Sequence, residues 1–239
     1  MSKIFGGYSK RVKYSSSLWG VNKGLSGFLQ KVNWQFEYAG TRRCVPAIYR
    51  FSKGIVFDII TFIDNDKLLE YHKKYEEVES NLTQMQRRCA EQENPYQDLS
   101  IKEIWINGQL VDGSYSSSSA ISIPWAENND NLLSLQKAYS YLLDETSCFA
   151  CQRFCIPYPK TKFMALRLMR LLRIDRVYAL KIHSHNVERF FPLDINFKIS
   201  NTEKQKEVNF VHPKTGIKHI MYLQGAEVME IPLSKDGSQ

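Results

Sequence analysis

The chain has 239 residues, of which 43% are hydrophobic and 24% are charged. This composition is typical of soluble globular proteins and argues against a disordered chain. No apolar run approaches the roughly 18–20 residues that cross a bilayer, so no membrane span is expected. The formal net charge is +7. The first 36 residues contain no acid and six cations, which are Lys3, Lys10, Arg11, Lys13, Lys23 and Lys31.

Residues 1–30 are therefore predicted to form a basic arm. Such an arm suits contact with nucleic acid or with an anionic surface, although a solvated terminus often carries the same charge pattern. The five cysteines cannot all pair within one chain, and the N-terminus lacks the apolar core of a secretory signal. Both observations favour a cytoplasmic protein with free or metal-bound thiols.

Three strands come first, at residues 32–38, 47–51 and 55–63, because these segments are rich in β-branched and aromatic residues. The last two are predicted to form a hairpin. Asp64 then offers a helix N-cap. One apolar face of a helix follows, at alternating spacings of three and four: Leu68, Tyr71, Tyr75, Val78, Leu82, Met85 and Cys89. The sequence leaves open a break in this helix near residues 80–81. We expect the helix to lie on the sheet rather than form a dimerising coiled coil, because two positions of the apolar stripe are Tyr.

The pair Asn107-Gly108 between apolar runs is the strongest short-range signal of a β-hairpin. The serine-rich residues 114–119 are expected to form a loop before a strand at residues 120–125. A second helix is predicted after residue 128, and a third at residues 161–173. The chain then returns to strands, at residues 177–184, 195–200, 207–212, 219–224 and 228–233, with a turn at residues 213–216.

Strands at both ends of the chain, with the helices collected between them, do not show the regular alternation of a parallel α/β sheet. We therefore predict a mainly β (α+β) fold, in which an antiparallel β-sandwich or jelly-roll-like core carries about three helices. One domain is predicted over residues 31–233, with a helical insert at residues 64–175. A disordered tail is expected at residues 234–239.

Three cysteines, Cys148, Cys151 and Cys155, lie within eight positions. Their spacing places them on one face of a helix, unless the preceding helix ends near residues 146–147 and the segment folds as a separate turn. The Cys-x-x-Cys part suits two thiolates on one metal or a dithiol pair, and the last cysteine with its Ile-Pro resembles the end of a bacterial ferredoxin cluster-binding run. A zinc site would need a further ligand from elsewhere, for example Cys44 or a histidine. Free, partly buried thiols are the simpler interpretation.

His183, His185, Glu188 and His219 form a second candidate metal site. Residues two apart on a strand face the same way, so the first two histidines are placed to bind one zinc or other transition metal. With Pro-Lys-Thr-Gly at residues 213–216, this order resembles the two metal-binding motifs of cupins, which implies a jelly roll with a His-His-Glu-His metal site. The glutamate lies one position early, and the proline and glycine are separated by two residues instead of one. The chain is therefore not assigned to that family, and ordinary half-buried sheet histidines are the alternative.

The helix expected at residues 161–173 carries Arg167, Arg170 and Arg173 on one face and an apolar stripe on another. Arginines interleaved with apolar groups suit docking on phosphates, on an acidic partner or on a membrane surface. A packed helix with a solvated arginine flank is the commoner arrangement. Two acids set among apolar residues, Asp58 and Asp194, form an acid/base pair only if the fold joins them.

These patterns favour a non-catalytic cytoplasmic module that binds an unidentified protein or small ligand. One alternative is a metal-binding protein, either a cupin-like enzyme with the histidine site or a protein with a Zn or Fe–S site at the cysteines. A further alternative is a nucleic-acid-binding protein that uses the basic helix.

Overall fold

The computed structural model describes residues 12–19, 24–75, 82–125, 130–144, 146–185, 189–190 and 206–223. The chain divides into two compact units, Met1–Glu188 and Arg189–Gln239. The predicted single domain over residues 31–233 runs across this division.

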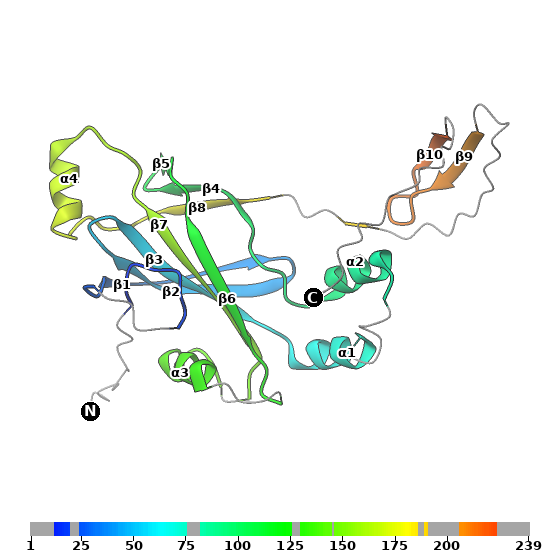
Figure 1. Cartoon of the computed structure of the whole chain (residues 1–239), viewed down its shortest axis with the longest axis horizontal. Coiled ribbons are helices and arrows are strands. Elements are labelled where there is room, and N and C mark those ends of the chain that lie inside the picture. The colour runs from blue at the N-terminus through cyan, green and yellow to red at the C-terminus, as the bar shows by residue number, and fades with distance from the viewer. Residues whose placement is uncertain are drawn as a thin grey trace, which may run out of the picture. The chain divides into compact units, whose positions relative to one another are not determined.

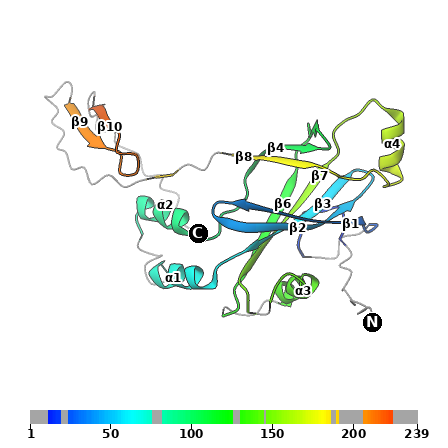
Figure 2. The same cartoon turned by 180° about the vertical axis from the view of Figure 1, so that it is seen from behind.

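A five-stranded antiparallel sheet, in the order β1-β2-β3-β7-β6, organises the first unit (Figures 1 and 2). Its strands are β1 (Phe28–Tyr38), β2 (Thr41–Arg50), β3 (Gly54–Phe62), β6 (Ser116–Ser122) and β7 (Phe149–Pro157). Strands β1 and β2 are joined at Ala39 and Gly40, both with positive φ, as a tight hairpin turn requires. The predicted hairpin of β2 and β3 is confirmed.

Strands β3 and β7 pair along their whole length, and both are buried on both faces. A strand covered on both sides reads as a nearly continuous apolar run rather than an alternation, and β3 follows this pattern over residues 54–62. The β7 residues alternate between two sets of neighbours. Phe154 and Ile156 belong to one core cluster, whereas Phe149 and Cys151 belong to another on the opposite face.

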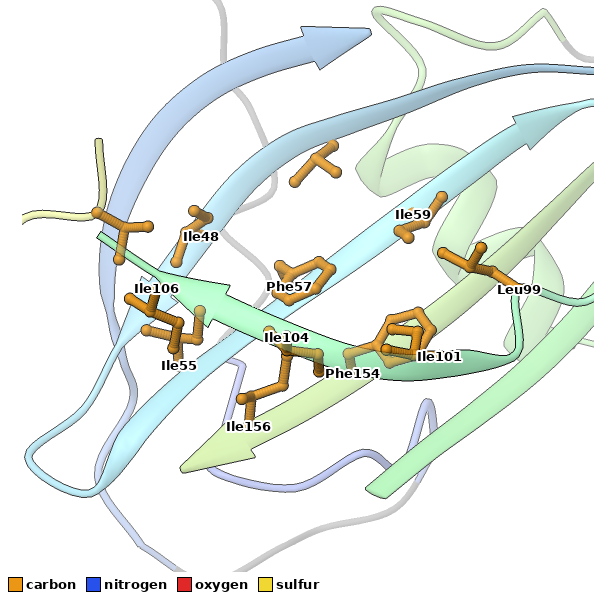
Figure 3. Packing of buried hydrophobic residues seen from close by; sticks show 12 residues of the cluster. Ile48, Ile55, Phe57, Ile59, Leu99, Ile101, Ile104, Ile106, Phe154 and Ile156 are labelled. Carbon is orange, nitrogen blue, oxygen red and sulfur yellow. The ribbon is translucent and has the colours of Figure 1, made fainter. Parts of the chain in front are cut away.

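A three-stranded sheet, in the order β5-β4-β8, packs against one face of the larger sheet. It consists of β4 (Ile101–Ile106), β5 (Gln109–Leu110) and β8 (Leu180–Ser184). The hairpin predicted at Asn107-Gly108 joins β4 to β5, with φ of +51° and +78° at the two turn residues. Figure 3 shows Ile101, Ile104 and Ile106 of β4 over the isoleucines and phenylalanines of β3 and β7, so the two sheets share one core.

The structure describes four helices, α1 (Asn65–Tyr75), α2 (Gln84–Glu93), α3 (Asp130–Ala138) and α4 (Met164–Leu171). The apolar pattern that the sequence shows after Asp64 spans two of these helices, α1 and α2. Helix α2 begins with a capping box, in which Thr83 and Gln86 each bond the backbone N–H of the other. Helix α3 lies on the side of the large sheet opposite β4 and β8 (Figures 1 and 2). None of the helices described is long and apolar enough to cross a membrane.

The described part of the second unit is an antiparallel hairpin of β9 (Lys206–Val211) and β10 (Lys218–Leu223). The predicted turn between them is confirmed, with Gly216 at φ +70°. The strands predicted at residues 195–200 and 228–233 and the tail at residues 234–239 lie outside the described residues. Half of the basic arm, residues 1–11 and 20–23, also lies outside them.

The predicted mainly β, antiparallel class is confirmed. The described strands form no closed barrel, and their order does not establish a jelly roll. Two local predictions are wrong. The serine run forms strand β6, because residues 116–122 pair with β7. The cysteine segment forms β7 rather than a helix or turn, because its pairing with β3 and β6 overrides the helical spacing of the cysteines.

Candidate binding surface

The three clustered cysteines fill three separate parts of the core. Cys151 packs beside Phe149, Cys155 beside residues 12 and 51, and Cys148 with residues 63 and 68. None of the five cysteines of the chain forms a disulfide bond. Burial raises the pKa of the Cys148 thiol to about 11, and it raises the pKa of Cys155 as well. These thiols act in the structure as small apolar side chains, and a metal or Fe–S role for them stays a prediction.

The candidate metal-binding histidines belong to both units of the chain. His183 lies on β8, where its Nδ1 is 3.1 Å from Glu103 Oε2. His185 follows β8 and its backbone N–H donates to Ser100. His219 belongs to the second unit, where its ring stacks on Phe210. Glu188 lies outside the described residues, among which no three His, Cys, Asp or Glu side chains are grouped to hold a metal ion. The cupin-like site therefore also stays a prediction.

The carboxylate of the buried residue Asp58 is held by polar partners inside the first unit. Its carboxylate accepts two hydrogen bonds from Arg153, the partner directly across from it on β7, at 2.6 and 2.7 Å. Tyr139, just after α3, donates its hydroxyl to the same carboxylate, and Arg153 also donates to the carbonyl of Ser17. Burial raises the pKa of Tyr139, and the Asp58 charge adds to this effect. The group joins β3, β7, α3 and residue 17, and Asp194 lies outside the described residues.

The three arginines of the predicted basic face have different surroundings. Arg170 is 8% exposed, and its guanidinium donates to the carboxylate of Asp175, to the carbonyl of Pro159 and to the amide oxygen of Gln109. It also stacks over the ring of Tyr158. Arg170 therefore binds α4 to the body of the unit and is not available to a partner.

The other two arginines lie nearer the surface. Arg173, at φ +59°, ends the helix; its guanidinium donates to the carbonyl of Ser26 at 3.3 Å and lies over the ring of Phe28. Arg167 is exposed on α4. The three arginines thus do not form one exposed face, and α4 is joined to the segment that leads into β1.

Helix α4 turns its apolar stripe outward. Met164, Leu168, Leu171 and Leu172 recur at helical spacing and share one face. Each is more than half exposed, with Met164 at 75% and Leu171 at 65%. The buried side of the helix carries Arg170. This orientation is the reverse of an ordinary surface helix, whose apolar stripe faces the core.

This exposed stripe continues onto neighbouring residues. We use the term apolar end for the exposed side chains of α4, of its two flanks and of the segment before β1: Leu25, Phe28, Phe163, Met164, Leu168, Leu171, Leu172 and Ile174. The contacts of Arg173 with Ser26 and Phe28 connect the two parts. Figures 1 and 2 place α4 and the start of β1 at the same end of the unit. Exposed apolar side chains gathered at one end of a unit form a candidate interaction surface.

The first unit has two surface cavities whose lining includes no residue of the apolar end. One of about 550 Å³ is lined by Tyr96, Asp98 and Ser119 among others, and one of about 340 Å³ by Glu103 and Tyr115 among others. Neither is lined by a residue of α4 or by any residue of the predicted metal sites. An ordinary packed domain buries the apolar faces of its surface helices. The exposed apolar end is the feature in which this unit differs from such a domain.

Comparisons of the chain with protein-family models, with curated proteins and with solved structures return no match. The sequence located the correct helix but assigned its apolar stripe to the core and its arginines to the surface. One local signal in the sequence, the complete absence of acids between residues 159 and 174, distinguishes this segment.

Proposed function

We propose that this protein is a non-catalytic binding module, built on a sandwich-like pair of sheets, that docks through its apolar end. The observation that carries the proposal is the orientation of α4. Its leucines and methionines face solvent while Arg170 is held inside by three hydrogen bonds. Exposed apolar side chains lose a favourable burial free energy of about 1.5–3 kcal/mol each, and a partner that covers them recovers it.

The alternative explanation of exposed apolar residues, a poorly anchored helix, does not fit the contacts. Arg170 connects α4 to the segment before it, to β5 and to the residues after it. Arg173 connects it to residue 26. Because Arg170 and Arg173 hold the C-terminal end of α4, the helix keeps its apolar stripe outward, and binding requires no rearrangement of the sheets.

A test compares the accessibility of the apolar end in cells and in the purified protein. Leu168→Cys places a thiol within the apolar end, and Met85→Cys places a matched thiol on the exposed side of α2. Both are made with Cys89→Ser, because Cys89 is the partly exposed native thiol and the other four are buried. Labelling by N-ethylmaleimide is then measured by mass spectrometry.

The proposal predicts that both thiols react rapidly in the purified protein. In intact cells the thiol at residue 168 should be protected, whereas that at residue 85 should react as before. Equal reactivity of the two positions in cells would show that the apolar end is uncovered, and the proposed function would then be wrong.

A further inference from the structure

The charges around the apolar end identify its partner more closely. Residues 159–178 contain six cationic side chains and one carboxylate, Asp175. That carboxylate is 13% exposed and is paired with Arg170 at 3.2 Å. Apart from the internal pair of Arg170 and Asp175, all charged side chains of this segment are cations. They belong to residues 160, 162, 167, 173 and 176. The partner of such a surface carries negative charge.

The apolar side chains identify the second property of the partner. They come from α4, from residue 163 before it, from residue 174 after it and from the segment at residues 25–28. Two separate chain segments therefore expose apolar groups at one end of the unit, and none of these groups lines either described cavity. A projecting helix with apolar groups at its surface and cations at its margins suits insertion into the boundary between headgroups and acyl chains.

We infer that the apolar end docks on the surface of an anionic lipid bilayer. This inference rests on the proposed function and names its partner. The leucines, methionines and Phe163 enter the interface, while Lys162 and Arg167 contact the lipid phosphates and carboxylates at its edge. The methylene stems of these cations lie along the apolar surface and leave the charged groups at headgroup level. With eight residues, α4 lies in the interface and does not span it.

The sequence before β1 is also basic. Residue 25 follows a stretch whose cations, among them Lys13 and Lys23, are not balanced by any acid before Glu37. Each cation near an anionic membrane adds about 1 kcal/mol of attraction, or roughly fivefold in affinity. A weak hydrophobic insertion and a cluster of cations together give stable binding where either alone is marginal.

Nucleic acid and an acidic protein are the competing partners. A nucleic-acid surface places cations centrally, where phosphates contact them. Here the exposed stripe of α4 is apolar, and Arg170 is held within the fold. A protein partner would have to supply an apolar groove shaped to α4 and to residue 28 together, whereas a bilayer conforms to both. The bilayer therefore accounts for the whole surface.

The test measures co-sedimentation of the full chain with large unilamellar vesicles. One vesicle preparation is pure phosphatidylcholine and the other contains 30% phosphatidylserine, each at about 0.1 M and about 0.5 M salt, between which charge screening increases strongly. We expect binding to the phosphatidylserine vesicles at low salt, and at least tenfold weaker binding at high salt or without the anionic lipid.

Two double variants separate the contributions. Leu168→Asp with Leu171→Asp removes apolar insertion, and Lys162→Glu with Arg167→Glu reverses two marginal charges. Each should lower vesicle affinity at least about tenfold. Two matched controls carry the same kinds of change on α1 and α2. One is Leu69→Asp with Met85→Asp, and the other is Lys73→Glu with Arg87→Glu. Both controls should bind vesicles like the unmodified protein. All these positions are exposed, so unchanged circular dichroism and urea unfolding verify the fold.

The outcomes distinguish this inference from the proposed function. No vesicle binding overturns the lipid inference; if residue 168 is still protected in cells, the partner is a protein and the proposed function stands. Vesicle binding that survives the leucine changes also overturns the inference, because the contact then lies elsewhere. A third outcome assigns the surface to nucleic acid and also overturns the lipid inference. In that outcome, the charge reversal weakens binding of a 30-nucleotide single-stranded DNA, while neither double variant changes vesicle binding.

Discussion

At the scale of single residues, buried charge is used to join distant segments. Arg153 and Asp58 are 4% and 1% exposed and form a bidentate pair across β3 and β7. Arg43 is fully buried, donates to the carbonyl of Gln97 and lies over the ring of Tyr38. A charge taken out of water is tolerated only with partners of this kind. Each such arginine therefore specifies which segments must meet.

The first prediction concerns the Asp58–Arg153 pair. Asp58→Asn leaves Arg153 buried without a counter-charge, so the free energy of unfolding should fall by about 3–5 kcal/mol. Urea denaturation followed by tryptophan fluorescence measures the change. Asp112→Asn is the control, because it removes only the exposed pair with Lys160 and should cause a much smaller loss. Equal stabilities of the two variants would contradict this account of the pair.

At the scale of secondary-structure elements, the strands that pair with a segment determine its conformation more strongly than its local sequence pattern does. The spacing of Cys148, Cys151 and Cys155 fits a helix, yet residues 149–157 form a central strand because β3 and β6 lie on either side. The serine run becomes β6 for the same reason. Helix α4 lies over residues 164–171, inside the predicted 161–173, but its buried side is opposite to that expected. A helical period shows that an apolar face exists and does not show what covers it.

The second prediction tests the anchor of α4. Arg170→Met removes hydrogen bonds to Asp175, Pro159 and Gln109 and should lower the free energy of unfolding by roughly 2–4 kcal/mol. The control is Arg167→Met on the same helix, which is exposed and should change stability by no more than about 0.5 kcal/mol. Urea denaturation gives both values. A larger loss for the residue-167 variant would show that the wrong arginine has been taken as the anchor.

At the scale of the whole molecule, the two units differ in the support that their strands receive. Strands β3 and β7 are covered on one face by β4 and β8 and on the other by α3. The described part of the second unit is a two-stranded hairpin whose side chains are mostly exposed. An isolated hairpin of two strands is at most marginally stable. Among the described strands, we therefore expect those of the first unit to be more stable than this hairpin.

The third prediction follows from this difference. In native-state hydrogen exchange, the amides of β3 and β7 should be the most protected and should open only with global unfolding. The amides of β9 and β10 should exchange many orders of magnitude faster, because few buried contacts oppose their opening. Mass spectrometry of proteolytic fragments resolves the two regions. Protection of β9 and β10 equal to that of β3 would refute the separation of stability between the units.

The sequence by itself determined the features that depend on a few neighbouring residues. These include the mainly β antiparallel class, the turn at Asn107-Gly108 with its positive φ values, the β2–β3 hairpin and the existence of a basic, apolar helix near residues 164–171. Turn chemistry and side-chain periodicity act over short distances, so they are visible in the chain itself.

Only the tertiary structure decided where those elements lie and which of their faces are covered. It placed the clustered cysteines on a central strand, paired Asp58 with Arg153 across 95 positions of sequence, and turned the leucines of α4 outward by binding Arg170 inside. The physical reason is that burial and ion pairing are settled by residues distant in the sequence. A local pattern shows that a face is apolar, and its neighbours in space decide whether that face enters the core or remains free for a partner.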